Sequence, residues 1–384
     1  MMHEKDYAPN DHRTHKEGPK MNCSEDYRLV TIDEKKDWQD IIASCGEYDT
    51  YHLAEYHRLA EQQGEGQPKL FKFSFRGYHA ALPFLIRPLS EVDGLEENRQ
   101  CDATSVYGYP GVLASIRQND IDADDFRSRF QGALEKTLKE LSIVAFFTRQ
   151  NPLLDTTWLL RGCAEIVPLC STVAIDLRMP EREQIRGMTK GHRYDIRKAR
   201  ESGVTAREVQ FLEYLDTFIS FYNQTMARKG AGEYYLFSKE YFLRLKENLR
   251  DSIRLYIAEL KGEPIAASMI LLSHKIVQYH LSGSPIAHPS LSGTKVIIDE
   301  VRRWATTNGF IWFHLGGGVG SQADSLFRFK AGFSNCRKTF EVIKWIIDPL
   351  TYNQLVNKHY NGDSRFFPAY RAPLATTISK SSEK

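Results

Sequence analysis

The residues with the clearest potential for chemistry lie in the segment 314–333. An apolar run, Phe310–Phe313, leads into His314, and four glycines follow within the five residues from Gly316 to Gly320. Because glycines let neighbouring backbone N–H groups converge on one point, this spacing predicts a site for a phosphate or an oxyanion. A short helix predicted to begin near Asp324 would add the partial positive charge of its N-terminus. The alternative is a tight surface turn followed by a helix that packs on the core.

Lys330 is the residue that we expect to act on the reacting atoms. On a helix it would neighbour Phe327, three residues earlier, and Phe329 and Phe333 add aromatic surface around the same turn. An ammonium among aromatic rings and close to glycine N–H groups could stabilise the negative charge of a tetrahedral intermediate. We therefore predict Lys330 and Phe329 as catalytic residues and Arg328 as a ligand-binding cation. The alternative is a surface lysine whose methylene stem covers apolar side chains.

A stripe of basic residues marks the segment between the two halves of the chain. Lys190, Arg193, Arg197 and Arg200 are spaced by three, four and three residues, so a helix would place them on one face, with Lys198 beside them. Like charges on one helix face repel one another, which favours an external partner. Arginine forks match phosphate oxygens, so the stripe predicts a pyrophosphate or the end of an RNA as its ligand. The alternative is a solvated helix face.

Several well-known catalytic motifs are absent from the sequence. The chain contains no His-Glu-x-x-His, no zinc-ligand spacing, no EF-hand loop, no Gly-x-Ser-x-Gly and no P-loop. Metal-dependent hydrolysis, serine hydrolysis and P-loop ATP hydrolysis are therefore disfavoured, and we expect neither a metal nor a tightly bound cofactor. His280 and His314 stand at the ends of predicted strands, where each is either a site residue or a half-buried histidine with satisfied hydrogen bonds.

Composition places the chain among ordinary globular proteins of about two domains. It has 384 residues, of which 42% are hydrophobic and 26% charged, and a formal net charge of +2, so no overall basic field indicates a nucleic-acid partner. The six cysteines form no Cys-x-x-Cys pair, which favours reduced thiols and a cytoplasmic protein. No apolar run approaches the roughly 18–20 residues that cross a bilayer. We expect no transmembrane segment and no DNA partner.

The same order of elements is predicted twice along the chain. Each copy begins with two alternating strands joined by a turn that contains glycine. An aromatic, turn-rich segment and an amphipathic helix follow, and each copy ends in an apolar strand. The first copy comprises 69–75, 79–86, 106–111, 126–141 and 143–147, and the second comprises 254–260, 264–272, 279–285, 294–306 and 310–313. This repetition predicts a duplicated α/β domain.

Four segments resemble the Fem family of non-ribosomal aminoacyltransferases and the wider group of FemAB-like acyltransferases of the GNAT type. Met188–Val204 is similar to the family's Arg-x-x-Ile-Arg-Lys-Ala-x-x-x-Gly-Val signature, and Tyr222–Arg228 is similar to its Tyr-x-x-Thr-Met-x-Arg element. Tyr279–Ser284 and Leu315–Phe333, which contains Phe-Lys-x-x-Phe, complete the resemblance, and Phe147–Pro152 is a looser match. The likeness covers most of residues 27–350.

The resemblance implies an α/β fold of two tandem GNAT-like domains, each a mixed sheet flanked by helices. This agrees with the duplication that the repeated order of elements predicts. We expect an N-terminal domain at 27–178, a basic helical link at 179–204 and a C-terminal domain at 205–350. A disordered arm at 1–26 and a loose tail at 351–384 would complete the chain.

The resemblance also implies acyl transfer to an amine. In the Fem ligases an aminoacyl-tRNA donates an amino acid to the peptide stem of a peptidoglycan precursor, and Lys330 matches the lysine that stabilises the transition state there. The expected partners are an acyl donor, either the 3′ end of a tRNA or a CoA thioester, and a cell-envelope precursor, with transient contact with a membrane surface. The residues expected to bind substrates are Lys190, Arg193, Arg197, Lys198, Tyr107, Tyr109, Arg149, Arg228, His280, Ser282, His314, Gly316, Gly317, Gly318 and Arg328.

Two departures from the family keep other substrates open. The charged helical-hairpin insertion of some Fem ligases is absent, and the acceptor-binding residues of the first domain have no clear match. The acceptor is therefore either a peptide stem or an amino sugar of a polysaccharide precursor. A second hypothesis is an acetyl-CoA-dependent GNAT that acts on a sugar nucleotide, although in the junction His288–Thr294 only Gly293 could serve in a pyrophosphate loop. A third is a non-catalytic module that binds polyanions through the basic stripe.

Overall fold

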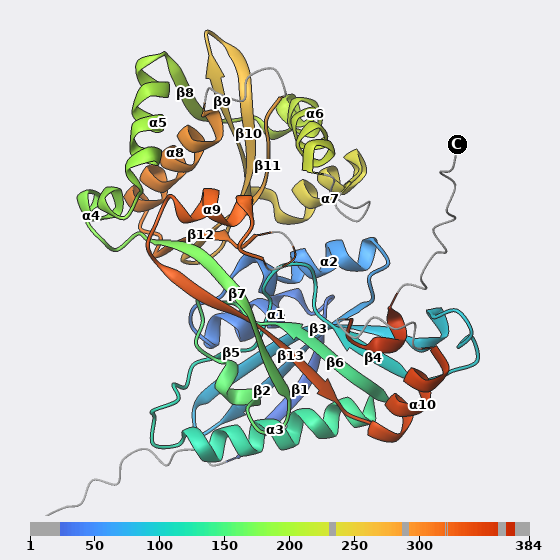
Figure 1. Ribbon diagram of the computed structural model, residues 1–384. Helices are drawn as coiled ribbons and strands as arrows, with labels where there is room; N and C mark the ends of the chain where they lie inside the picture. Colours follow the sequence, from blue (N-terminus) through green and yellow to red (C-terminus); the bar gives the residue numbers. More distant parts are fainter. Residues whose placement is uncertain are drawn as a thin grey trace, which may run out of the picture.

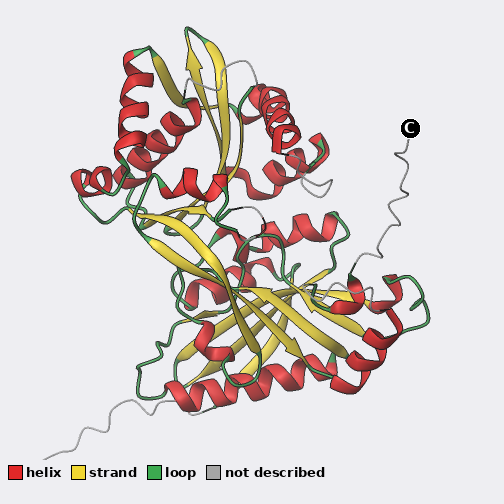
Figure 2. Ribbon diagram, viewed as in Figure 1, coloured by secondary structure: helices red, strands yellow, loops and turns green. Residues whose placement is uncertain are grey.

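The computed structural model describes residues 24–229, 236–285, 292–318, 320, 322–359 and 366–372. Two halves are stacked on one another, and two long strands run from one half into the other (Figure 1). Strands form the middle of each half and helices cover them (Figure 2).

The first half is a twisted sheet with helices on both faces. Its strands are β1 (Asp26–Thr31), β2 (Gln67–Phe75), β3 (Tyr78–Pro88), β4 (Cys101–Thr104), β5 (Leu113–Ala114), β6 (Ile143–Arg149) and β7 (Glu165–Asp176). Its helices are α1 (Lys35–Ser44), α2 (Ala54–Gln62) and α3 (Ala123–Glu140), with short 3-10 turns η1 (Thr50–His52), η2 (Leu89–Glu91) and η3 (Thr157–Leu160).

The second half has the same kind of architecture. Its strands are β8 (Val204–Val209), β9 (Ile253–Leu260), β10 (Glu263–Leu272), β11 (Ile276–Gly283), β12 (Trp312–Gly316) and β13 (Arg337–Ile346). Its helices are α4 (Glu181–Arg186), α5 (Lys190–Glu201), α6 (Phe211–Lys229), α7 (Lys239–Leu249), α8 (Gly293–Thr307), α9 (Ser325–Ala331) and α10 (Pro349–His359), with 3-10 turns η5 (Arg250–Ser252) and η7 (Ala369–Arg371).

The two halves share one pattern of strand pairing, which confirms the predicted duplication. In each half an antiparallel hairpin comes first, β2–β3 in one and β9–β10 in the other. The next strand then pairs in parallel with the strand after the amphipathic helix, β4 with β6 and β11 with β12. Parallel neighbours need a long crossover connection, which contains α3 in the first half and α8 in the second.

The two hairpins turn through equivalent pairs of residues. Arg76 and Gly77 have φ angles of 52° and 80°, and Lys261 and Gly262 have φ angles of 53° and 84°. Two successive residues with positive φ make the turn type that matches the twist of antiparallel strands, and glycine adopts it without steric cost. The predicted hairpins are therefore confirmed, and their turns set the register of each pair.

One strand from each half of the chain pairs with the other half. β7, which is encoded in the first half, pairs with β12 of the second, and β13, encoded in the second, pairs with β6 of the first. β7 and β13 also pair with each other, so the strands form one continuous order, β1-β2-β3-β4-β6-β13-β7-β12-β11-β10-β9-β8. The boundaries that we predicted at residues 178, 204 and 350 stay predictions along the chain; in space the two sheets are joined.

A shared apolar cluster also joins the halves. Trp38 and Tyr56 of the first half belong to the same buried cluster as Phe218 and Phe242 of the second, where α1 and α2 face α6 and α7. Two further clusters lie within the halves, one under α3 and one between the second sheet and helices α5 and α8. Because one cluster draws on both halves, burial of its side chains stabilises their union as well as each fold.

Some segments differ from the prediction. The residues expected to form a loose tail from 351 continue helix α10 as far as 359, and 369–371 form η7. Residue 26, expected in the disordered arm, begins strand β1. The rest of the arm, the glycine-bearing interruption at 230–232 and the junction at 288–291 lie outside the described residues. None of the helices in the described part of the chain has the length and apolarity needed to cross a membrane.

Candidate functional site at the seam between the halves

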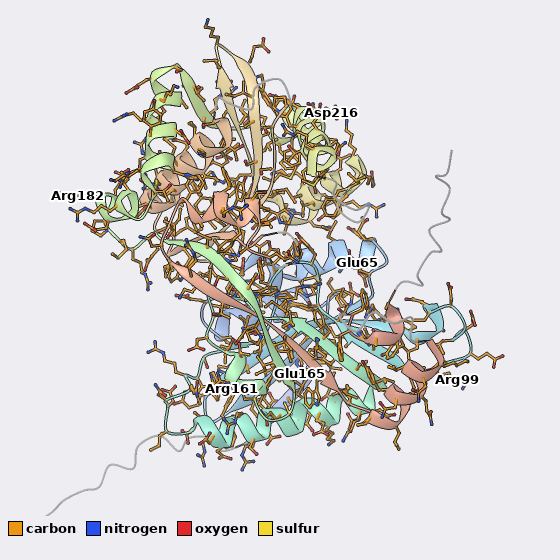
Figure 3. All side chains as sticks on the ribbon, viewed as in Figure 1. Glu65, Arg99, Arg161, Glu165, Arg182 and Asp216 are labelled. Carbon is orange, nitrogen blue, oxygen red and sulfur yellow. The ribbon has the colours of Figure 1, made fainter. Side chains whose placement is uncertain are left out.

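Aromatic and imidazole rings from both halves meet at the seam. Side chains fill the space between the ribbons of the two halves (Figure 3). The hydroxyl of Tyr51 lies 3.4 Å from His280 Nδ1, and the Tyr107 ring lies 6.3 Å from the His280 ring. The Tyr109 ring lies 5.8 Å from that of Tyr51 and 5.1 Å from that of His314. The structure thus brings together four residues predicted from distant parts of the sequence.

Lys330 lies beside this cluster, on the buried face of α9. Asp324 begins the helix, and its side chain accepts a 2.8 Å hydrogen bond from the Phe327 N–H. Only 9% of Lys330 is exposed, and its Nζ donates a 2.8 Å hydrogen bond to the Gly317 carbonyl. Burial lowers the pKa of Lys330 to about 8, although Asp324 and Cys170 oppose the shift. The ammonium is therefore able to lose and regain its proton near neutral pH.

The glycine run places a carbonyl, instead of a row of N–H groups, next to this ammonium. Gly316 has a φ of 78°, and a Cβ there would lie 3.2 Å from Lys330 Nζ and 3.5 Å from the Tyr109 hydroxyl. A Cβ on Gly318 would collide with the Gln322 carbonyl and the Asp324 carboxylate. The Asp324 carboxylate also fills the N-terminus of α9, where we expected an anion. Gly316 therefore allows close packing on Lys330 and Gly318 allows close packing on the start of α9, whereas a Cβ on Gly320 would meet nothing within 4 Å.

The two histidines of the site are neutral. Burial lowers the pKa of His314 to about 3, and the charge of Lys330 adds to this shift. Burial alone lowers the pKa of His280 to about 4. His314 Nδ1 lies 2.9 Å from the side-chain oxygen of Gln278, so this histidine has one hydrogen-bonded and one unpartnered nitrogen among the described residues.

Arg149 adds a positive charge to the first-half wall of the seam. It ends β6, and its guanidinium donates a 3.3 Å hydrogen bond to the Ser105 hydroxyl and lies 5.1 Å from the centre of the Phe147 ring. Burial raises the pKa of Glu65, and Arg149 opposes that shift. Burial also raises the pKa of Tyr109, and Arg149 is among the groups that oppose it. Arg149 is thus placed to meet an anionic group.

The predicted basic stripe lies on α5 and begins next to α9. Thr189 caps α5, and its backbone N–H donates to the Gly332 carbonyl at 2.9 Å, while His192 Nε2 lies 2.9 Å from the Phe329 carbonyl. Lys190, Arg197 and Lys198 are exposed, whereas Arg193 is half-buried. Arg197 and Lys198 lie over the ring of Tyr194, which is 52% exposed.

Not every member of the stripe is available to a ligand. Arg200 forms an ion pair with Asp299 of α8 at 2.8 Å. Arg193 donates a 3.4 Å hydrogen bond to the Ile185 carbonyl. The exposed edge of the stripe carries Lys190, Lys198 and Arg197, the last of which lies 3.8 Å from the Glu201 carboxylate.

Three other predicted residues lie away from the cluster. Arg228 donates to the Ser284 carbonyl at 2.8 Å and so ties α6 to the end of β11. Ser282 accepts a hydrogen bond from the Tyr279 hydroxyl. Arg328 is exposed and donates to the Ala323 carbonyl at 3.1 Å. The Phe329 ring is half-buried against Phe333, at 5.5 Å, and against His192.

Sequence reasoning missed residues that the structure places at the centre of the seam. Asp49, Tyr51, Cys170 and Gln278 belong to no motif. The available signal was the polar Gln278 in the otherwise apolar strand start Ile276–Tyr279, because a buried polar side chain usually has a partner. Cys170 on β7 lies close enough to Gly317 that a Cβ on that glycine would stand 3.4 Å from its sulfur.

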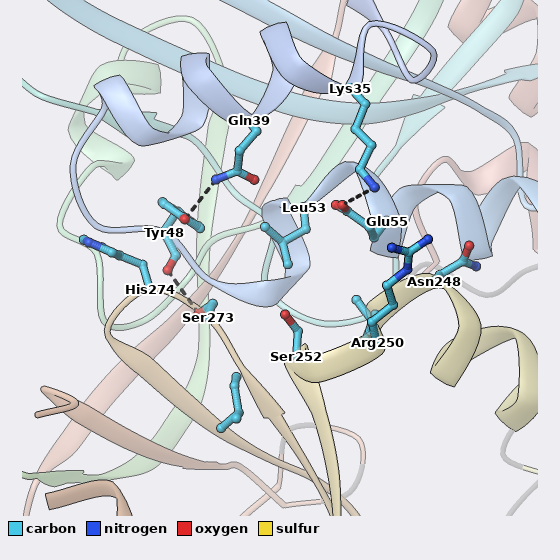
Figure 4. A pocket seen from close by; sticks show the side chains of 12 residues that line it. Lys35, Gln39, Tyr48, Leu53, Glu55, Asn248, Arg250, Ser252, Ser273 and His274 are labelled. Carbon is cyan, nitrogen blue, oxygen red and sulfur yellow. Dashed lines mark hydrogen bonds and ion pairs between the residues drawn. The ribbon is translucent and has the colours of Figure 1, made fainter. Parts of the chain in front are cut away.

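A separate cavity of about 350 Å³ opens at another place along the seam (Figure 4). Lys35 and Glu55 form a 2.7 Å ion pair in its wall, and Ser273 donates a 3.2 Å hydrogen bond to the Tyr48 carbonyl. Its lining residues are Lys35, Gln39, Tyr48, Leu53, Glu55, Asn248, Leu249, Arg250, Ser252, Leu272, Ser273 and His274. None of these is a predicted site residue. We therefore place the candidate site at Lys330, whose buried ammonium can take part in acid–base chemistry, and not at this cavity.

Comparison with known proteins identifies the fold. Residues 190–330 match the model of the acetyltransferase (GNAT) domain. The chain is similar to the crystal structure of FemX, with a TM-score of 0.67 and 11% identity over 86% of this chain and 99% of that one. It is also similar to the C-terminal domain (DUF2156) of a protein from Agrobacterium fabrum described as a candidate lysylphosphatidylglycerol synthetase, with a TM-score of 0.50 and 15% identity over 84% and 96% of the two chains.

These similarities confirm the tandem GNAT-like fold that the sequence predicts. At 11% and 15% identity these similarities show a common fold, and the substrates of the two proteins are not transferred to this chain. No curated protein matches the chain by sequence.

Proposed function

We propose that the protein is an N-acyltransferase of the Fem type. It transfers an aminoacyl group from an aminoacyl-tRNA to an amine of a cell-envelope precursor, either a peptidoglycan stem peptide or an amino sugar of a polysaccharide precursor. The observation that carries this proposal is the buried ammonium of Lys330, with a pKa of about 8, at the seam of two GNAT-like halves. We place the reaction in the cytoplasm, where aminoacyl-tRNA is made.

The reaction needs no metal and no covalent enzyme intermediate. The acceptor amine attacks the carbonyl carbon of the donor ester, a C–N bond forms, and the carbonyl electron pair moves to oxygen. The Lys330 ammonium stabilises that oxyanion. The C–O bond to the ribose then breaks, the released oxygen takes a proton and the nitrogen loses one, which leaves an amide and a free hydroxyl. A lysine with a pKa near 8 can give the first proton and accept the second.

Two surfaces of the molecule suit the two substrates differently. The exposed cations of α5 and the Tyr194 ring between them offer phosphate contacts and a stacking surface, which is how proteins hold single-stranded RNA ends. This face begins beside α9 and so beside Lys330. The first-half wall of the seam carries Tyr107, Tyr109 and Arg149, a mixture of rings and a cation that favours an anionic acceptor with a sugar or peptide part.

Replacement of one side chain tests the proposal. Lys330→Ala should lower kcat by about 100-fold, as does the loss of an oxyanion donor, while the fold is retained. Lys139→Ala is the control, because Lys139 is an exposed lysine of α3 that forms an ion pair with Glu135 of the same helix. The assay incubates protein, aminoacyl-tRNA and an envelope precursor and measures the mass added to the acceptor. Full activity of Lys330→Ala would remove the assigned role.

A second candidate function is an acetyl-CoA-dependent N-acetyltransferase that acts on a sugar nucleotide or another small amine. The match of residues 190–330 to an acetyltransferase domain favours it. Calorimetric titration with CoA distinguishes the two functions. A clear binding isotherm supports the CoA-dependent enzyme, and no heat of binding supports the aminoacyl donor.

A further inference from the structure

A series of buried hydrogen bonds crosses the seam and ends at His314. The imidazole of His314 packs against Tyr109, and the Tyr109 hydroxyl and Lys330 Nζ both lie near Gly316. Asp49, the residue before η1 in the first half, accepts a hydrogen bond from the side-chain amide of Gln278 on β11. The Gln278 oxygen lies 2.9 Å from His314 Nδ1 on β12. Gln278 and His314 are direct partners in the parallel pairing of these strands, so their side chains point the same way. All three side chains are buried.

The donors and acceptors of this series permit one arrangement. The Asp49 carboxylate accepts from the Asn151 amide at 2.7 Å and from the Thr50 N–H at 2.6 Å, so it is an acceptor at every contact. Gln278 must therefore turn its NH₂ group to Asp49 and its oxygen to His314. That oxygen needs a donor, so His314 carries its proton on Nδ1 and leaves a lone pair on Nε2.

The free nitrogen of His314 calls for an explanation. Nε2 is buried without a hydrogen-bond partner among the described residues, and leaving such an acceptor unpaired is unfavourable. The Tyr109 ring packs against the imidazole at 5.1 Å, so the ring has little freedom to turn. Burial lowers the pKa of this imidazole to about 3 and the Lys330 charge adds to the shift, so the imidazole stays unprotonated.

We propose that Asp49, Gln278 and His314 are positioning residues that present an unprotonated Nε2 beside Lys330. This inference rests on the proposed function, because it concerns the same lysine. In the resting state the ammonium donates to the Gly317 carbonyl. Nε2 gives it a second acceptor of fixed position, so the ammonium keeps a hydrogen bond when it turns toward the oxyanion. Because Asp49 belongs to the other half of the molecule, this arrangement exists only when the halves are joined.

The tautomer of His314 is the first test, and it needs no substrate. Imidazole ¹⁵N NMR of the full-length protein at about pH 8, above the pKa of about 7 to which burial raises Asp49, reports which nitrogen carries the proton. The His314 signal is assigned by its loss in His314→Gln. We expect the proton on Nδ1. A proton on Nε2 in the unaltered protein overturns the proposal, whatever any variant does.

Asp49→Asn is the second test, because it replaces a hydrogen-bond acceptor at the start of the Asp49–Gln278–His314 series by a donor of nearly the same volume. An amide cannot accept at both carboxylate positions, which take hydrogen bonds from Thr50, Asn151 and Gln278. Where its NH₂ group faces Gln278, the Gln278 amide turns its own NH₂ group to His314 and moves the histidine proton to Nε2. We expect kcat to fall by at least about 10-fold, the usual effect of losing a side chain that orients a reactive group, with KM changed less than about twofold. The double variant Asp49→Asn, Gln278→Glu returns an acceptor to His314 Nδ1 and should restore the tautomer and part of the activity.

Ser273→Ala is the matched control, since it removes another hydrogen bond between the halves, to the Tyr48 carbonyl, and leaves the series intact. It should change neither the tautomer nor kcat. An Asp49→Asn variant with the original tautomer and unchanged kcat overturns the positioning role. If Asp49→Asn does not fold, Gln278→Met, which interrupts the series without adding a donor, takes its place. If the tautomer changes in Asp49→Asn but the unaltered protein transfers no acyl group, the proposed function is contradicted. The positioning of His314 by Asp49 and Gln278 is then still supported.

Discussion

The ammonium of Lys330 donates a 2.8 Å hydrogen bond to the carbonyl of Gly317, the residue that follows the end of β12. A backbone carbonyl cannot neutralise the positive charge as a carboxylate would. The ammonium is therefore held in place by a hydrogen bond but is not stabilised by a paired negative charge, so it loses its proton easily.

The first prediction concerns activity and pH. If the protonated form of Lys330 stabilises the oxyanion, kcat should fall as the pH rises through about 8, the value to which burial lowers the lysine pKa. In Lys330→Arg the guanidinium keeps its proton, so this alkaline decline should disappear even if activity is lower. Stopped-time assays across the pH range measure it. An identical decline in both proteins would assign it to another group.

The second prediction concerns stability and pH. The pKa of Lys330 is about 8 in the folded protein and 10.5 when unperturbed, so between these values the unfolded chain binds more protons. Stability then rises with pH across this window, by up to about 3 kcal/mol relative to Lys330→Met, whose residue does not titrate. Urea denaturation of both proteins at several pH values measures the difference. A difference that is constant over the window would contradict a buried, perturbed lysine.

The third prediction separates backbone strain from contact with the lysine. Gly316 and Gly309 have similar φ angles, 78° and 74°, but a Cβ meets Lys330 Nζ only at Gly316 and nothing within 4 Å at Gly309. Both alanine variants should lose about 1–2 kcal/mol of stability to the left-handed backbone. Only Gly316→Ala should lose activity, by about 10-fold or more, because its methyl group displaces the ammonium. Equal activity of the two variants would show that the lysine tolerates the contact.

The fourth prediction concerns the outer edge of α5. Replacing Arg197 and Lys198 by glutamine should raise KM for aminoacyl-tRNA and reduce the slope of log affinity against log salt by about one per cation, with kcat little changed. Replacing the exposed Lys36 and Lys139 of the first half is the control. The competing view of the protein as a polyanion-binding module expects the same salt-sensitive binding in Lys330→Ala, without any acyl transfer by the unaltered protein.

Local pattern was enough to predict much of the fold. The glycine turns at Gly77 and Gly262, the helical spacing in α3 and α8, and the three- and four-residue spacing of the basic stripe on α5 are properties of a few neighbouring residues. Such local signals can be read from the sequence without knowledge of the tertiary contacts of the helix or turn. They also led to the duplicated architecture.

The missing parts depend on contacts between distant residues. Nothing near Arg337–Ile346 in the sequence says that this strand pairs with β6, almost 200 residues earlier. The glycine run was identified as part of the site, but whether Gly317 offers its N–H or its carbonyl depends on where Lys330 lies. Asp49 and Gln278 are ordinary polar residues until the two halves meet.

The exchange of β7 and β13 limits how the molecule can move. Each sheet contains a strand supplied by the other half, and the two strands also pair along their length. Separation of the halves would therefore break the ladder hydrogen bonds of both strands. A gene fragment that ends after residue 178 would also leave β6 with an open edge where β13 belongs, so neither half is a self-sufficient building block for protein engineering.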